Sequence, residues 1–250
     1  MGGPARRRAG PGSVETVVGQ KVNPIGFRIG VTEDWRSRWY APKAAYGEFL
    51  IEDQKIRRHV DAKLNRKPPF AAVSDVEIER TRNEVKVLLH TARPGLVIGP
   101  KGADVERLQG ELEELIDRNV KVDIIEVKNP DLDATLVAEG IAEQLKKRSS
   151  FRRVMKQRCE AAMQAGARGV KIICAGRLGG SELARREKQS LGSIPLQTLQ
   201  ANVRYGFAVS KTSYGTIGVK VWIYLGHYGE EVAEPPPSSG RPRQRRMRRG

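Results

Sequence analysis

The chain contains 250 residues, enough for two domains, because single domains commonly run to about 100–150 residues. Its 45 Lys and Arg against 29 Asp and Glu leave a formal net charge of +16, which favours a polyanionic partner. The sequence has no long apolar run and no secretory signal pattern, so we expect a cytoplasmic protein with no membrane partner. Cys159 and Cys174 are too few for a disulfide framework or a zinc site, and we expect both to be buried as small hydrophobic residues.

The N-terminal part divides into two segments. Residues 1–18 hold three consecutive arginines among Gly, Pro and Ala, and this composition predicts a disordered basic arm. Glycines and a proline punctuate apolar residues over 19–46, which predicts an extended segment that anchors the start of the chain. Trp35 and Trp39 alternate with arginines in this segment. We interpret them as core or interface anchors, although such interleaving can also stack bases.

An amphipathic helix and a hairpin follow. Ile56, Val60 and Leu64 recur at four-residue spacing, which predicts a helix within 47–64 that ends before a pair of prolines. Apolar and polar residues then alternate in two short runs separated by a polar turn. This pattern predicts two strands of a hairpin, around 76–78 and 85–89.

The hairpin leads into a Gly-x-x-Gly loop, formed by Gly99, Pro100, Lys101 and Gly102, between a short helix and a longer one. Because glycine lacks a Cβ atom, a sugar-phosphate backbone can lie close to this loop and to the positive end of the second helix. Four residues alone also fit an ordinary helix-helix turn. A nucleotide-binding P-loop is excluded, since the spacing G-x-x-x-x-G-K-[ST] is not met.

A third strand around 120–124 completes the order helix-strand-strand-helix-helix-strand. This order resembles a type II KH domain, which implies a clamp for about four nucleotides of single-stranded RNA or DNA. We assign residues 47–128 to this domain. Its second helix and third strand are rich in Asp and Glu, so only the loop end suits RNA, and the acidic side is either solvated or docks basic proteins.

A second domain is expected over residues 132–226, after a break at Asn129-Pro130-Asp131. Apolar spacing predicts one helix up to the serines at 149–150 and a second helix, capped by a serine, up to about Gly166. Strands are predicted around 170–174, 203–209 and 219–223. The fold class is therefore α+β: a KH domain followed by a small α/β domain with two helices on a mainly antiparallel sheet. Residues 176–181 form a glycine-rich turn that could host phosphate or be a plain turn, and 227–250 read as a disordered, arginine-rich tail.

The helix after Ser150 carries a row of cations. Arg152 and Lys156 share a face at four-residue spacing, Arg153 lies beside them, and Arg148 extends the line if the helix continues through the serines. No acid occurs between Glu143 and Glu160. A solvated face is the ordinary explanation, but such a face usually mixes signs, so the row favours a bound anionic partner.

An enzyme, either a nuclease or a nucleic-acid-repair lyase, is one alternative class. The three histidines, at positions 59, 90 and 227, show no metal-ligand spacing, and the carboxylates lie mainly in amphipathic or acidic helical stretches. We therefore expect no catalytic residues, no metal, no cofactor and no small-molecule substrate. A free KH-domain regulator that binds RNA remains a further alternative.

Five sequence blocks in the same order make the chain similar to one family, the bacterial-type small ribosomal subunit protein three. The blocks cover 19–24, 90–99, 151–156, 175–182 and 214–223, and the likeness extends over nearly all of 19–226. The resemblance implies a structural protein of the small-subunit head that binds ribosomal RNA. It also implies neighbours, namely small-subunit proteins four, five, ten and fourteen, and a place at the pore through which messenger RNA enters.

The resemblance gives roles to particular residues. It implies that Arg148, Arg152, Arg153 and Lys156 meet incoming messenger RNA and help to open base-paired messenger. With the family in view, we expect further contacts with ribosomal RNA from seven cations: Lys21, Arg28, Arg36, Arg38, Arg177, Arg185 and Arg186. Two departures are evident, because Pro100 stands where relatives often have lysine, and residues 1–18 extend beyond the usual start.

Overall fold

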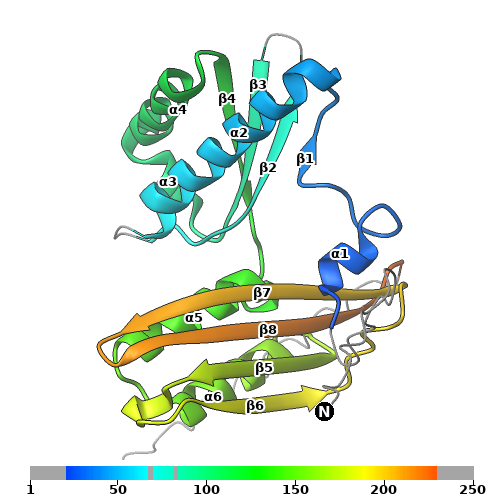
Figure 1. Ribbon diagram of the computed structural model, residues 1–250, viewed down its shortest axis with the longest axis vertical. Coiled ribbons are helices and arrows are strands. Elements are labelled where there is room, and N and C mark those ends of the chain that lie inside the picture. The colour runs from blue at the N-terminus through cyan, green and yellow to red at the C-terminus, as the bar shows by residue number, and fades with distance from the viewer. Residues whose placement is uncertain (1–20, 67–69, 82–83, 230–250) are drawn as a thin grey trace, which may run out of the picture.

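The computed structural model describes residues 21–66, 70–81 and 84–229, with Lys101 described through its backbone alone. The predicted basic arm over 1–18 and residues 230–250 of the predicted tail lie outside the described residues. The tail was predicted from 227, but His227 belongs to the last strand of the second unit and the Tyr228 N–H donates to the Gln200 carbonyl, so that boundary is wrong. The described chain forms two α+β units joined by the segment after β4, and the KH-like unit is the upper one in Figure 1. Among the described helices, none has both the length and the apolar character that a membrane crossing requires.

The first unit has the predicted order of elements around a mixed sheet. The sheet order is β1-β2-β3-β4, with β2 and β3 antiparallel and the two outer pairs parallel. The elements are β1 (Ser37–Arg38), α2 (Lys43–Val60), β2 (Val73–Arg80), β3 (Glu84–Thr91), α3 (Pro94–Ile98), α4 (Ala103–Ile116) and β4 (Asn119–Glu126); α1 (Pro24–Arg28) precedes them and lies against the second unit. A single π-helical turn, Asp61–Asn65, continues α2, and the predicted helix and hairpin are confirmed.

The hydrophobic periods of α2, β3 and α4 explain this packing. Ile56 and Val60 on α2 are buried, as are Leu108 and Leu112 on α4, while β3 buries every second residue. Figure 1 shows α2 and α4 lying across the same side of the sheet. Their apolar stripes therefore close one core against the β2–β3 hairpin and β4.

The second unit places two helices on an antiparallel sheet, as predicted. Its elements are α5 (Ala134–Lys146), α6 (Phe151–Gln164), β5 (Gly169–Gly176), β6 (Arg185–Gly192), β7 (Ala201–Thr212) and β8 (Gly215–His227), and its sheet order is β6-β5-β8-β7. The helices pack on one face of the sheet. Gly206 permits this approach, because a Cβ there would lie 2.0 Å from the carbonyl oxygen of Ala134 on α5. Both cysteines are fully buried in this core, as predicted, and burial raises the pKa of Cys159 to about 11 and of Cys174 to about 12.

Three local features differ from the sequence-based expectations. β6 was not predicted, because this edge strand is polar and exposed at nearly every second position and offers no apolar alternation. The supposedly extended segment contains the short helix α1, begun by Pro24 and capped by the Asn23 side chain, which accepts from the Ile25 N–H. The same segment also contributes the two-residue strand β1, which was not predicted, whereas the break near the serines is as predicted: α5 ends at Lys146 and α6 begins at Phe151.

The first described segment, residues 21–46, is anchored to both units. The Trp39 indole donates to Asp53 at 2.8 Å and packs against Tyr46 and Phe49, so its predicted role as an anchor is confirmed. Trp35 is 63% exposed and is therefore not a core residue, and an interface role for it stays a prediction. On the second unit, α1 lies beside β7, where the buried side chain of Arg28 holds it.

Candidate nucleic-acid interface

The Gly-x-x-Gly loop lies between α3 and α4, where the sequence placed it. Gly99 (φ 69°) and Gly102 (φ 86°) both adopt backbone conformations that favour glycine. Gly102 is the N-cap of α4 and provides no capping side chain. The Ala103 N–H donates to the Pro100 carbonyl, so the N–H groups that follow it in the first turn of α4 are the backbone donors for a phosphate.

A carboxylate lies directly against this loop. A Cβ at Gly99 would come within 2.0 Å of Asp104 Oδ2, so the side chain of Asp104 occupies the space that glycine leaves. Glu106 also belongs to the first turn of α4. Both acids stabilise the positive end of the helix, but they offset its attraction for a phosphate. The backbone of the loop is therefore shaped to hold a phosphate, but the two nearby acids weaken its electrostatic attraction for one.

The α6 cations form a more strongly basic surface. Arg152, Arg153 and Lys156 are all exposed on the first two turns of the helix. The nearest carboxylate oxygens lie 3.8 Å away, Glu187 from Arg152 and Glu160 from Lys156, too far for hydrogen bonds. With the Arg152 side chain 75% exposed and that of Lys156 70% exposed, these pairs contribute little and leave the cations available.

Arg148 and Ser150 differ from what the sequence suggested. Arg148 lies between the two helices with φ 59°, so it does not extend the α6 row along a continuous helix. It is exposed a few residues before the row begins and remains a candidate through its position in the connection. Ser150 occupies the N-cap position as predicted, but its side chain makes no capping hydrogen bond.

Arg28 must be removed from the expected ribosomal RNA contacts. Its side chain is fully buried, its Nε donates to the Ala201 carbonyl at 2.8 Å, and its terminal nitrogens donate to the carbonyls of Pro24 and Thr198. A cation enclosed by carbonyls is inaccessible to phosphate. The guanidinium instead fastens α1 to the second unit, which sequence alone did not reveal because Arg28 looks like its exposed neighbours.

Arg36 and Arg38 are partly exposed but paired with acids on β2. Arg36 Nε lies 2.9 Å from Asp75 and Arg38 Nη2 lies 2.7 Å from Glu77. Burial raises the pKa of Asp75, and the Arg36 guanidinium opposes that rise. An RNA phosphate would have to compete with these carboxylates, which weakens both arginines as RNA ligands.

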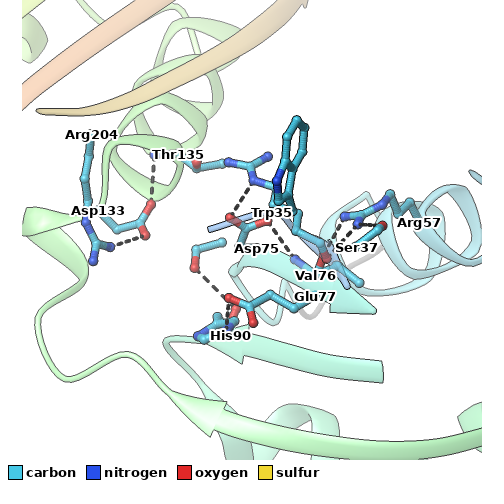
Figure 2. Close-up of polar contacts among 12 residues, drawn as sticks. Trp35, Ser37, Arg57, Asp75, Val76, Glu77, His90, Asp133, Thr135 and Arg204 are labelled. Atoms are coloured by element: carbon cyan, nitrogen blue, oxygen red, sulfur yellow. Dashed lines mark hydrogen bonds and ion pairs between the residues drawn. The ribbon is translucent and has the colours of Figure 1, made fainter. Parts of the chain in front are cut away.

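Figure 2 shows the polar contacts around these pairs and toward the second unit. Arg57 donates to Ser37 at 2.9 Å and also to the Val76 carbonyl, which fixes β1 against β2, and burial lowers the pKa of Arg57. Asp133 accepts from the Thr135 N–H at 2.9 Å at the start of α5 and lies 3.4 Å from Arg204 of β7. These polar contacts serve the architecture rather than a ligand.

The remaining expected RNA contacts fall into two groups. Arg177 fastens the glycine-rich turn by donating to the carbonyls of Ser181 and Tyr214, which supports the plain-turn interpretation of 176–181. Arg185 lies over the Phe151 ring at 5.4 Å and near Glu187. Lys21 and Arg186 are exposed, and within the described residues neither has an acidic partner at ion-pair distance.

The sequence did not predict that other cations lie beside Arg186. Strand β6 places Arg186 and Lys188 on one side of the sheet, and the register brings Lys220 of β8 to the same side. The two-residue spacing of Arg186, Lys188 and Ser190 was a signal for such a strand face. It was overlooked because strands were sought through apolar residues.

The histidines have ordinary structural partners. His59 Nε2 lies 2.9 Å from Glu111, and His90 Nε2 lies 3.3 Å from Glu77. Glu111 also accepts from Lys63 at 2.7 Å, and this hydrogen bond is the main reason that its pKa is lowered. In the part of the chain that the structure describes, no three His, Cys, Asp or Glu residues are grouped to hold a metal ion.

Known proteins match both units. Residues 55–132 match the family described as KH domain, and residues 141–223 match the family described as Ribosomal protein S3, C-terminal domain. Relatives named small ribosomal subunit protein uS3 include that of Rhodopirellula baltica, 55% identical over 216 residues, which covers 86% of this chain and 91% of the relative. Those of Desulforamulus reducens and Parvibaculum lavamentivorans are 51% and 50% identical, covering 89% and 88% of this chain and 99% and 90% of the relatives.

Proposed function

Because the chain belongs to the family of small ribosomal subunit protein uS3, we propose that its α6 cations line the pore through which messenger RNA enters the subunit. Family membership itself makes the chain a structural, RNA-binding constituent of the small ribosomal subunit in the cytoplasm, not an enzyme. The finer proposal is that Arg152, Arg153 and Lys156, with Arg148 beside them, hold incoming messenger and help to open its base pairs.

The observation that carries this proposal is the exposed α6 row itself. Like charges at i and i+4 destabilise a helix, yet Arg152 and Lys156 occupy that spacing with no carboxylate at hydrogen-bond distance. A standing anionic partner removes this cost. A fixed row of cations would hold the phosphates of one strand and disfavour reannealing, while translocation supplies the work and no ATP site is required.

The Gly-x-x-Gly loop takes a different part in the same proposal. Gly99, Pro100, Lys101 and Gly102 would bind ribosomal RNA through backbone N–H groups at the start of α4, and the exposed Lys21 would add a contact from the N-terminal segment. The neighbours implied by the family, proteins four and five at the pore and ten and fourteen in the head, are part of this proposal. Crosslinking in purified small subunits tests each neighbour.

The test of the pore is translation through structure. We expect the triple change Arg152→Ala, Arg153→Ala and Lys156→Ala to leave assembly nearly normal, to slow translation through a stable messenger hairpin, and to spare an unstructured messenger. A matched control removes three exposed cations from α2, namely Lys43, Lys55 and Arg58, by the same change to alanine. Equal slowing on both messengers would indicate a general anchoring role, and no slowing on either would make α6 a solvated face.

A further inference from the structure

The sheet of the second unit has one face covered by α5 and α6 and one face turned away from them, toward the viewer of Figure 1. We call the second face the outer face and define it by three rows of residues across β6, β5, β8 and β7. The strand registers give these rows as Ser190, Lys171, Trp222 and Tyr205; then Lys188, Ile173, Lys220 and Phe207; then Arg186, Ala175, Gly218 and Val209.

The outer face carries cations and no acids. Its four cations are Lys171, Lys188, Lys220 and Arg186, and within the described residues none of them has a carboxylate at ion-pair distance. Glu187 is the one acidic residue in the four strands, and it lies on the opposite face because its register partner is the buried Cys174. The charge of this face is therefore not neutralised by its own sheet.

The cations of this face lie close enough to repel one another around Lys171. Burial lowers the pKa of Lys171, and the nearby charges of Lys21, Lys188 and Arg186 lower it further. Lys171 Nζ relieves part of this cost by lying 5.3 Å over the Trp222 ring. An anion bound across the rows would relieve the rest.

An aromatic ring is available beside these cations. Phe207 is 52% exposed, and its ring lies beside Gly218, where a Cβ would come within 3.7 Å of Phe207 Cε2. Its register partner on β8 is Lys220, so a base stacked on the ring would leave its phosphate near an ammonium group. Tyr205 and Trp222 continue the aromatic surface with ring centres 5.3 Å apart.

The loop before β7 covers one end of the outer face, so a ligand can reach only the other end. Ile194 and Leu196, from the loop before β7, pack against Ala201, Val203 and Tyr224, and the Arg28 side chain binds this loop to α1. Ile173 and Trp222 of the outer face are buried in this same cluster, whereas Phe207 and Val209 are half exposed. Four strands about 4.8 Å apart span roughly 14 Å, enough for a few nucleotides, as on other four-stranded RNA-binding sheets.

We propose that the outer face binds a single-stranded segment of ribosomal RNA, with one base stacked on Phe207 and phosphates held by Arg186, Lys188 and Lys220. Ribosomal RNA is favoured over messenger because stacking immobilises a base, whereas messenger must slide. A protein partner is less suitable, because protein interfaces have an apolar centre. Among the described residues, the large apolar side chains of this face that are half exposed are Phe207 and Val209 alone, and cations surround them. The proposal rests on the RNA binding of the family and is independent of the α6 pore.

The first experiment measures binding of the full chain to a 12-nucleotide oligouridine by fluorescence anisotropy. We expect Phe207→Ala to weaken binding by about 5- to 150-fold, as loss of one stacked base does, and Phe207→Trp to restore it. Lys188→Ala with Lys220→Ala should reduce the slope of log affinity against log salt by about 1.4. The matched control is Lys55→Ala with Lys121→Ala, two exposed cations of the first unit, and circular dichroism checks the fold.

The second experiment identifies the occupant in the assembled particle. We expect Phe207→p-azidophenylalanine, irradiated in purified small subunits, to crosslink to ribosomal RNA. Crosslinks to messenger alone, or to a protein alone, would overturn the proposal, as would an unchanged oligouridine affinity for Phe207→Ala. The α6 triple variant should show the same crosslink, so failure of the pore proposal is distinguishable from failure of this one.

Discussion

The two units of this chain use their charges in opposite ways. Residues 47–128 contain 15 Lys and Arg against 16 Asp and Glu, a net charge of −1, whereas residues 132–226 contain 16 against 6, a net charge of +10. The first unit carries the loop that most clearly suggested RNA binding. The second unit carries the exposed, weakly paired cations of α6 and the acid-free outer face.

The difference teaches that a recognisable motif and the source of affinity need not coincide. In the first unit, cations form ion pairs with acids of the same unit, as Arg80 does with Glu52 and Asp53. In the second unit, the outer face carries cations and no acids, and the α6 cations Arg152 and Lys156 meet carboxylates only at 3.8 Å. Since phosphate contacts supply much of the affinity for nucleic acids, we expect the second unit to dominate RNA binding.

The largest expected effect tests whether the cations of the first unit are structural. Arg80 donates from Nε to Asp53 Oδ1 at 2.9 Å, and both side chains are only 4% exposed. Arg80→Ala removes the buried cation from Glu52 and Asp53, which keep only their contacts with Arg118 and Trp39, and should lower the free energy of unfolding by about 3–5 kcal/mol, as measured by urea denaturation.

The matched change in the second unit is Lys188→Ala, at an exposed position with no ion pair among the described residues. It should alter the free energy of unfolding by less than about 0.5 kcal/mol. A loss below about 1 kcal/mol for Arg80→Ala would mean that the first unit holds its cations loosely. The contrast between the units would then fail.

A second prediction concerns the acids where the two units meet. Burial raises the pKa of Glu139 on α5 from 4.5 to about 7, with further contributions from Asp61, Glu143 and Asp133. The folded chain therefore binds more protons than the unfolded chain between pH 4.5 and 7, and stability falls as pH rises through this window. Above pH 7 the Glu139 carboxylate is charged in the folded chain as well, and the full loss of stability from burying that charge is present.

Glu139→Gln keeps the side chain neutral at every pH. We expect it to match the natural chain near pH 4.5 and to exceed it by about 1–3 kcal/mol at pH 8, after discounting for partial exposure. Urea denaturation at both pH values measures the difference. The exposed Glu114→Gln on α4 serves as the control with no expected pH-dependent gain, and an identical pH profile for both variants would show that Glu139 is not desolvated.

The sequence predicted what periodicity and glycine spacing specify. The order of helices and strands in the first unit followed from the spacing of Ile56 and Val60, the alternation in the hairpin and the two loop glycines. The core of the second unit followed from apolar spacing in the same way. Strand β6 was missed because an edge strand with one exposed polar face lacks the apolar signal. Arg28 was misjudged because the carbonyls that enclose it come from α1 and from 195–201, and such a long-range enclosure leaves no trace in local sequence.

The smallest expected effect concerns the Gly-x-x-Gly loop of the first unit. Replacing Pro100 and Lys101 with aspartates changes the local charge by three units while both glycines remain. Asp104 already lies against Gly99, so the field that these changes oppose is weak. We expect the affinity of the full chain for oligouridine to fall by roughly threefold.

The same charge change in the second unit should cost more. Lys188→Asp with Ser190→Asp alters two exposed β6 residues, one cation and one neutral side chain as in the loop, and removes a cation that we assign to phosphate. We expect this pair to weaken oligouridine binding by roughly tenfold or more at the same salt concentration. If the loop pair proves the more damaging while circular dichroism shows both variants folded, the backbone N–H groups of α4 are the principal RNA ligand. Affinity would then follow the motif, and the excess charge of the second unit would need a different partner.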